Sequence, residues 1–155
     1  MSVARRMFRI AIPCSSPSHS SACWRFFAEA LGPDACVMDG YGQTETAGLV
    51  LLHAPSAWRP EPGTVGAAFF GVRPALVDDE GREVAGPSVR GHLVLRGAFP
   101  GMARTVAGDH ARFEKYYSEF SGGVYSTGDG AERASSGFFK ITGRLDDGER
   151  ISCLS

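Results

Sequence analysis

Three short polar segments carry the side chains that could do chemistry. They are residues 40–48 (GYGQTETAG), 126–130 (STGDG) and 143–147 (GRLDD), and each follows an apolar, β-like stretch. Glycines let backbone N–H groups and hydroxyls approach a phosphate closely, and a carboxylate can hold a divalent cation or accept hydrogen bonds from hydroxyls. One such segment alone is usually an ordinary turn. The three together predict a pocket for a nucleotide.

A helix and a strand precede the first polar segment and must position it. The helix is predicted over 24–31 (WRFFAEAL), where Trp24, Phe27 and Leu31 have helical spacing and GPD ends the pattern. A short apolar strand, ACVM, then leads directly into residues 40–48. Ligands of open α/β sheets bind at the ends of such strands, so this position favours a binding loop.

The remaining elements are mostly strands. Strands are expected in 64–70, 72–84 and 91–97, the second turning at DDEG, where Gly81 can take a positive φ. A second helix is predicted over 109–120 with Asp109 as its N-cap. It places Phe113, Tyr116, Tyr117 and Phe120 on one side, a stripe that we interpret as core rather than as a cofactor site. Residues 123–149 read as strand, turn, strand and turn, which gives a mixed α/β fold.

Composition narrows the class of protein. The net charge is −1, from 16 basic and 17 acidic residues, so nothing in the overall charge favours nucleic acid or an acidic membrane surface. No apolar run approaches the ~20 residues of a membrane-spanning helix. The four cysteines form no C-x-x-C pair, which argues against a zinc site or a disulfide framework. We expect a soluble, intracellular protein.

The first 28 residues differ from the rest. They contain several arginines, many serines and no acidic residue before Glu29, which is the composition of an organelle transit peptide. A start site misplaced inside a longer gene would look the same. The location is therefore a mitochondrion or another organelle on the first interpretation, and the cytoplasm on the second.

Four stretches in unbroken order resemble one enzyme family. YGQTETAG, FPGMARTVAGDHARFEKYYSEF, YSTGDGAER and FFKITGRLDD are similar to the adenylate-forming acyl-CoA synthetases, and PGMARTVAGDHARF is similar to the acetyl-CoA synthetase branch in particular. The resemblance implies a partial AMP-binding domain over 24–147, between a poorly defined or targeting-like segment (1–23) and a short tail (148–155). It further implies the end of an α/β sheet subdomain followed by a β-barrel-like subdomain.

The resemblance also implies a reaction. A short-chain carboxylate would attack the α-phosphate of ATP, and coenzyme A would then displace AMP to give a thioester. Thr44 would bind the α-phosphate, Glu45 would hold Mg²⁺, and Asp129 would accept the ribose hydroxyls. Arg144 would reach ribose and phosphate, and Tyr41 would lie against adenine. The implied nucleotide site comprises Tyr41, Gln43, Thr44, Asp129 and Arg144, with Thr44, Glu45 and Arg144 acting in catalysis.

Gly42 departs from the acetyl-specific pattern. Where those enzymes resemble WWQTE, this chain has YGQTE, so no indole closes the acyl pocket. Each methylene buried in the space left would contribute ~0.8 kcal/mol. We therefore predict an enzyme that accepts propionate, butyrate or longer acids as well as or better than acetate, unless a bulky side chain from elsewhere fills the gap.

Other parts of the family pattern are missing from this sequence. We find no Gly- and Thr-rich phosphate loop with its lysine, and SPS at 16–18 stands where a GEP-type segment would border adenine. Asp146 matches the hinge before a lysine-bearing C-terminal domain, and Lys115 and Lys140 are interpreted as solvated or snorkelling. We expect a ligase fragment with little or no activity alone, which exposes apolar faces such as part of 64–70.

Three alternatives remain open at this point. The chain could be a non-catalytic module that binds a nucleotide or a partner. It could be a fragment of a medium-chain acyl-CoA ligase, which resembles YGQTET but not the GMARTVAGDHARF stretch. It could also be a gene-model product with no function.

Overall fold

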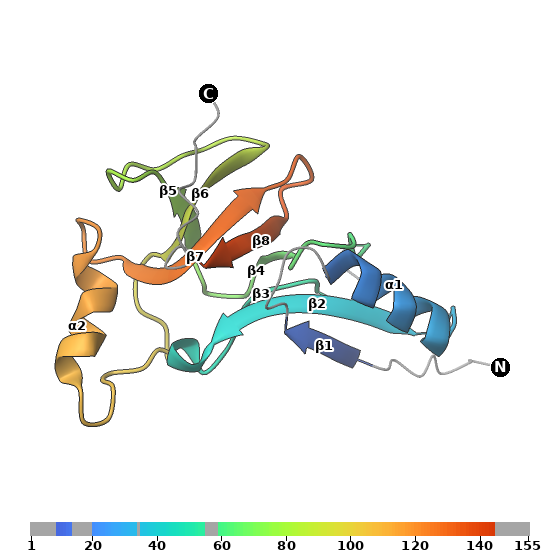
Figure 1. Ribbon diagram of the computed structural model, residues 1–155, viewed down its shortest axis with the longest axis horizontal. Helices are drawn as coiled ribbons and strands as arrows, with labels where there is room; N and C mark the ends of the chain where they lie inside the picture. The colour runs from blue at the N-terminus through green and yellow to red at the C-terminus, as the bar shows by residue number, and fades with distance from the viewer. Residues whose placement is uncertain (1–8, 14–19, 34, 55–58, 145–155) are drawn as a thin grey trace.

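The chain forms two four-stranded sheets and two α-helices in the described residues of a computed structural model, which are 9–13, 20–33, 35–54 and 59–144. The strand orders are β1-β2-β3-β4 and β5-β6-β7-β8. Figure 1 shows the first sheet beside helix α1 and the second beside helix α2. The mixed α/β class predicted from the sequence is confirmed.

The first sheet is mixed. Strand β1 (Arg9–Pro13) runs parallel to β2 (Cys36–Gln43), while β3 (Gly48–Leu52) and β4 (Ala67–Ala68) continue the sheet antiparallel. Helix α1 (Ser20–Leu31) connects β1 to β2, and the indole Nε1 of Trp24 donates a 3.1 Å hydrogen bond to the Val37 carbonyl. The predicted helix over 24–31 is therefore confirmed, but it begins one turn earlier.

The second sheet is antiparallel throughout. It consists of β5 (Pro74–Val77), β6 (Val89–Leu95), β7 (Tyr125–Arg133) and β8 (Phe139–Arg144). Gly81 has φ +77° in the turn after β5, and its N–H donates to the Asp78 carbonyl at 3.0 Å. The predicted DDEG turn is confirmed.

The expected β-barrel is not formed by the described strands. A barrel requires its first and last strands to pair, whereas β5 and β8 are the two ends of the strand order. Phe139 on β8 exchanges hydrogen bonds of 2.7 and 2.8 Å with Val65 and Gly66 instead. The outer edge of β8 is thus occupied by the segment that leads into β4, and the sheet stays open.

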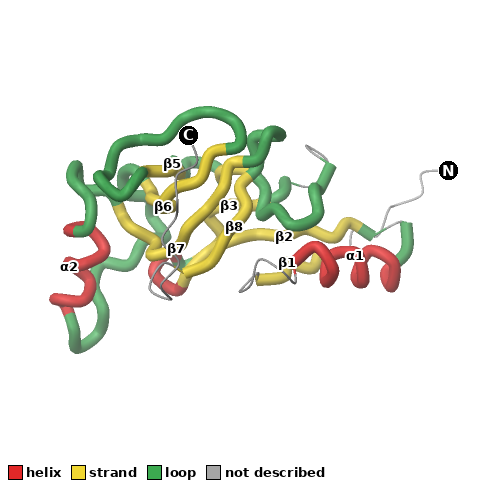
Figure 2. Tube along the Cα trace, turned by 45° about the horizontal axis from the view of Figure 1, so that its top comes forward, coloured by secondary structure: helices red, strands yellow, loops and turns green. Residues whose placement is uncertain are grey.

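One apolar cluster joins the two sheets. Val50 and Leu51 of β3 are buried together with Leu76, Leu93 and Tyr125 of the second sheet. Figure 1 shows β3 between β2 and the strands of the second sheet, and Figure 2 shows β2 running from α1 toward those strands. The two sheets therefore present their neighbouring ends to a shared space, and the residues that border it can act together.

Helix α2 (His110–Ser118) begins as predicted. The Asp109 carboxylate accepts a 2.9 Å hydrogen bond from the Arg112 amide, which is the geometry of an N-cap. Tyr116 and Tyr117 pack against the shared core, and Phe120 is buried in a smaller cluster with Val77. The interpretation of the aromatic stripe as core is thus confirmed for these residues. The hydroxyl of Tyr116 also reaches the polar segment, where it donates a hydrogen bond to Glu45.

Two of the polar segments were expected as loops and are largely strand. Residues 126–130 lie inside β7, and residues 40–43 belong to β2. The composition STGDG is typical of a turn, but β7 is paired with β6 on one side and β8 on the other, which keeps it extended. The expected strand at 64–70 is shorter than predicted, since only Ala67–Ala68 form β4.

Candidate nucleotide-binding site

A cavity of about 640 Å³ lies where the ends of β2, β7 and β8 meet helix α2. This volume is within the roughly 300–1,000 Å³ of small-molecule sites. Its walls come from parts of the chain that are far apart in sequence. The lining residues are 40–45, Gly48, Leu49, Arg112, Tyr116, Tyr125, Thr127, Asp129, Ile141, Gly143 and Arg144.

The cavity collects nearly all of the residues that the sequence singled out. Those that line it are Tyr41, Gly42, Gln43, Thr44, Glu45, Asp129 and Arg144. Asp129 on β7 and Arg144 on β8 are direct partners in the antiparallel register. Asp146, the expected hinge residue, lies outside the described residues, as does the expected tail at 148–155. The three polar segments therefore converge, as far as the structure describes them.

Asp129 is the centre of a hydrogen-bond network between the two sheets. Its Oδ2 accepts from the Tyr41 hydroxyl at 2.5 Å and from the Gln43 Nε2 at 2.9 Å. Asp129 is itself largely buried, and its amide donates to the Thr127 hydroxyl at 3.2 Å. A carboxylate held in this way has its orientation fixed before any ligand arrives.

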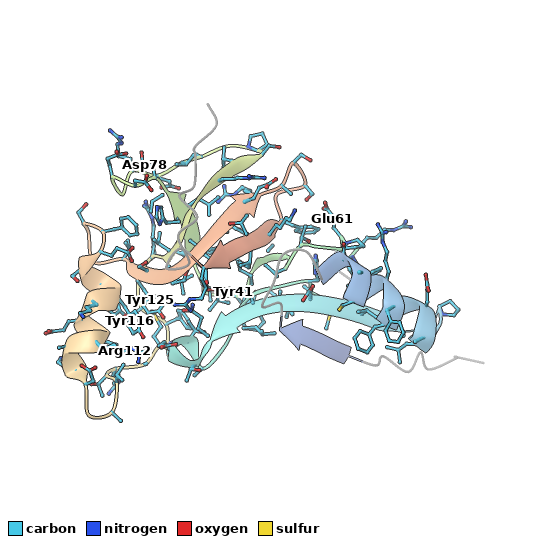
Figure 3. The ribbon with its side chains drawn as sticks, in the orientation of Figure 1. Tyr41, Glu61, Asp78, Arg112, Tyr116 and Tyr125 are labelled. Atoms are coloured by element: carbon cyan, nitrogen blue, oxygen red, sulfur yellow. The ribbon has the colours of Figure 1, made fainter. Side chains whose placement is uncertain are left out.

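Tyr41 remains a hydrogen-bond donor throughout the physiological pH range. Burial raises the pKa of the Tyr41 phenol strongly, and the neighbouring charge of Asp129 raises it further. The hydroxyl points toward Asp129, while the residue lines the cavity. Figure 3 shows Tyr41 near the centre of the molecule, between β2 and the second sheet.

Both ends of the Gln43 amide are bound by protein groups. Nε2 donates to the Thr127 carbonyl at 2.7 Å as well as to Asp129, and Oε1 accepts from the Tyr125 hydroxyl at 2.9 Å. In this structure Gln43 therefore orients Asp129, which is a role that the sequence did not indicate.

Thr44 and Glu45 lie on a single turn of 3-10 helix, η1 (Thr44–Thr46). The turn is fixed by Thr46, whose buried hydroxyl oxygen accepts a 2.9 Å hydrogen bond from the Gln43 amide. Its single proton is shared between the carbonyl oxygens of Gln43 and Gly48, each 2.9 Å from the hydroxyl oxygen. Thr44 is exposed toward the cavity. The turn is thus preformed, and it presents one hydroxyl and one carboxylate to the same space.

The space assigned to a missing side chain at Gly42 is not empty. A Cβ at this position would overlap the carbonyl oxygen of Gly48 and lie 3.1 Å from the Leu49 Cα. The register of β2 and β3 shifts between Tyr41 and Gly42, which brings the two backbones together here. The reasoning that glycine opens a free volume in this direction is therefore wrong for this structure, although Gly42 does border the cavity.

Several lining residues were missed by the sequence reasoning. Arg112 and Tyr116 are four positions apart on a helix that was predicted correctly, so they share a face. Thr127 was inside a segment that had been singled out, but only Asp129 of that segment was given a role. The apolar lining of Leu49 and Ile141 carries no local signal.

The carboxylate of Glu45 lines the cavity and could bind a metal ion that enters together with the phosphates of a ligand. Among the described residues no cluster of three or more His, Cys, Asp or Glu side chains could hold a metal ion. Mg²⁺ commonly binds one or two carboxylates and completes its shell with substrate phosphates and water. Glu45 beside a cavity of this size fits that pattern.

No helix in the described part of the chain could span a membrane.

The polar lining of this cavity agrees with the family to which the sequence belongs. The chain belongs to the AMP-binding enzyme family, which matches residues 5–105, a range that includes β1 and begins before Trp24.

Within this family the chain is similar to acetyl-coenzyme A synthetases. It is 38% identical over 150 residues to the chloroplastic/glyoxysomal protein of Arabidopsis thaliana, covering 96% of this chain and 20% of that one. It is 45% identical over 130 residues to the protein of Shewanella amazonensis (83% and 20%) and 41% identical over 150 residues to that of Alkalilimnicola ehrlichii (96% and 23%). The chain thus spans about a fifth of the length of these relatives.

Proposed function

We propose that this chain forms the ribose- and α-phosphate-binding part of the ATP site of an AMP-forming acyl-CoA ligase. The observation that carries the proposal is the convergence of Thr44, Asp129 and Arg144 on one cavity. These residues come from three separate segments, and in the proposed site one mononucleotide would contact all three. The similarity to acetyl-coenzyme A synthetases supplies the reaction class.

Asp129 is proposed to accept hydrogen bonds from the ribose hydroxyls. An ionised carboxylate can accept hydrogen bonds from both hydroxyls of a diol, and the donors bound to Oδ2 hold the Asp129 carboxylate in place. Arg144, its partner across β7 and β8, would contact ribose and phosphate. The ring of Tyr41 would lie against adenine, with its hydroxyl anchored on Asp129.

Thr44 and Glu45 are proposed to form the phosphate end of the site. Thr44 would donate its hydroxyl to the α-phosphate, where negative charge develops in the transition state, and a donor fixed on a rigid turn stabilises that charge without reorganisation. Glu45 would hold Mg²⁺, which when bound neutralises charge on the phosphates.

The proposed reaction joins a short-chain carboxylate to coenzyme A with release of AMP and pyrophosphate. The carboxylate oxygen bonds to the α-phosphorus as pyrophosphate leaves, and the thiol then displaces AMP. Backbone rather than a side chain borders the cavity at Gly42, and Leu49 and Ile141 add apolar lining. We keep acids longer than acetate as the proposed substrates because of this apolar lining, and not because of a missing side chain at Gly42.

Nucleotide titrations of the 155-residue chain test the binding part of the proposal. Asp129→Asn should weaken AMP binding by about 10–100-fold, since a hydrogen bond to a charged group contributes ~1.5–3 kcal/mol. Glu83→Gln is the control, because this exposed residue pairs with Arg96 on the surface. Wild-type AMP affinity in Asp129→Asn would contradict the proposal.

A chimera tests the chemistry. The aligned segment of the Shewanella amazonensis synthetase would be replaced by that of this chain, and pyrophosphate release would be measured with acetate, propionate and butyrate. We expect turnover that is lost in Thr44→Ala and that does not decline from acetate to butyrate. A correctly folded chimera without pyrophosphate release would show that the segment supports binding without chemistry.

A further inference from the structure

The carboxylate of Glu45 is held from helix α2. The Tyr116 hydroxyl donates a 2.9 Å hydrogen bond to Glu45 Oε1, across 71 positions of sequence. The Glu45 carbonyl accepts a 2.7 Å hydrogen bond from the Ala103 amide. Residues 103–116 therefore fix Glu45 at both its main chain and its side chain.

Gly101, which lies just before residues 103–116, packs closely against Thr46, the residue that follows Glu45. A Cβ at Gly101 would lie 2.7 Å from the Thr46 carbonyl oxygen, so only a glycine allows this close approach. Phe99, Met102 and Tyr116 pack against the main apolar core. The support for the turn is thus anchored in the core and does not depend on exposed contacts.

Two neighbouring tyrosine rings hold alternate residues of the polar segment. The rings of Tyr116 and Tyr125 are 5.5 Å apart, and their hydroxyls bind Glu45 and Gln43 respectively. Thr44 lies between these two anchored residues and faces the cavity. In Figure 3, Tyr116 and Tyr125 lie between α2 and the end of β2.

Arg112 adds a positive charge to this arrangement. It precedes Tyr116 by one helical turn and lines the cavity. Its interaction with Tyr116 raises the pKa of the Arg112 guanidinium, and the charge of Glu45 raises it further. The exposed guanidinium of Arg112 therefore lines the same cavity as Tyr116 and Glu45.

We propose that Tyr116 is a positioning residue that fixes Oε1 of Glu45, so that Oε2 meets the Mg²⁺ ion arriving with ATP. This inference rests on the proposed function. Within the described residues, Tyr116 is the one hydrogen-bond donor to this carboxylate. Partners that orient a metal-binding side chain typically change metal affinity by about 10–100-fold when they are removed.

The test compares two tyrosine-to-phenylalanine variants in the 155-residue chain. Tyr116→Phe removes the hydroxyl and keeps the ring that packs on Tyr125. Tyr117→Phe is the matched control, because its ring also packs on Tyr125 at 5.6 Å and no hydrogen bond of its hydroxyl is found within the described residues. ATP affinity is measured by calorimetry over a range of Mg²⁺ concentrations, and AMP affinity is measured without Mg²⁺.

Mg²⁺ should strengthen ATP binding, and the Mg²⁺ concentration that gives half of this gain in affinity is the quantity compared. We expect it to be about tenfold higher in Tyr116→Phe than in the wild type. AMP affinity without Mg²⁺ should stay within about twofold, as should both quantities in Tyr117→Phe. In a Glu45→Gln background, Tyr116→Phe should have no further effect on the Mg²⁺ dependence, since the two residues act as a unit.

Three outcomes would overturn the inference. Unchanged or stronger Mg²⁺ dependence in Tyr116→Phe would reject Tyr116 as a positioning residue while the nucleotide site stands. An equal loss of AMP and Mg²⁺-ATP binding would assign Tyr116 a purely structural role. A wild-type chain that binds neither nucleotide would reject the proposed function and this inference with it. The Mg²⁺ activation constant of the chimera, measured at saturating ATP, gives a second and independent readout.

Discussion

The Tyr41 hydroxyl lies 2.5 Å from Oδ2 of Asp129, and this hydrogen bond joins β2 to β7 over 88 positions of sequence. Both residues are buried, and both line the cavity. The contact therefore belongs to the packing of the two sheets and to the candidate site at the same time. Changes to it should alter stability and nucleotide binding together.

Tyr41→Phe removes this donor and keeps the ring. Because the acceptor is a buried carboxylate, we expect the free energy of unfolding to fall by about 1.5–3 kcal/mol, with weaker AMP binding. Urea unfolding followed by circular dichroism measures the first effect, and titration with AMP measures the second. Tyr117→Phe, which loses no hydrogen bond in the described part of the chain, is the control. Unchanged stability in Tyr41→Phe would mean that the carboxylate gains another donor.

Gly42→Ala tests the close approach of β2 and β3. The added methyl group would overlap the Gly48 carbonyl, so the strands must separate, and we expect a loss of about 1–3 kcal/mol as for other overpacked sites. Gly48→Ala is the matched control, because a Cβ there meets nothing within 4 Å. Urea midpoints of the two variants decide the matter. Equal midpoints would restore the idea of open space beside Gly42.

The convergence of the site could be predicted from sequence, because its residues belong to short ordered motifs. Thr44, Asp129 and Arg144 were identified in this way, and the structure brings them to one cavity. The helix capped by Asp109 and the turn at Gly81 also follow from local rules of capping and backbone conformation. Local signals thus located the elements and the polar side chains.

Long-range relationships could not be predicted in the same way. The contact between Gly42 and Gly48 depends on a register shift, and that of Tyr116 with Glu45 depends on how α2 docks. The open second sheet depends on the pairing of Val65 and Gly66 with Phe139. Each is decided by tertiary packing, which the periodicity of a single segment does not encode.

Phe70→Ser should reduce self-association without changing stability. Phe69 and Phe70 are 43% and 87% exposed, in agreement with the exposed apolar face that the sequence predicted for part of residues 64–70. Removing an exposed ring changes the free energy of unfolding by less than about 0.5 kcal/mol, while a smaller apolar patch lowers association. Light scattering over a concentration series measures the effect. The same change at Phe26, which is 65% exposed on α1, shows whether the effect is confined to the patch.

His53 should make the stability of the fold depend on pH. Its ring is buried, with Nε2 3.0 Å from the Thr64 hydroxyl and 3.5 Å from the Glu61 amide, and it packs edge-on against Phe138. Burial lowers the pKa of His53 below 6.5, and this effect outweighs the opposing influence of Asp39 and the charge of Glu61.

The direction of the pH effect follows from linkage. Below pH 6.5 the unfolded chain binds a proton at residue 53 that the folded chain does not yet bind, so stability is complete above that pH and falls as the pH decreases toward the folded pKa. Melting temperatures of the wild type and His53→Gln between pH 7.5 and 5.5 measure the difference. The decline should be smaller in His53→Gln, whereas His110→Gln, which alters an exposed histidine on α2, should retain the wild-type decline. If the melting temperatures of the wild type and His53→Gln fell in parallel with pH, burial would not lower the pKa of His53 in the folded chain.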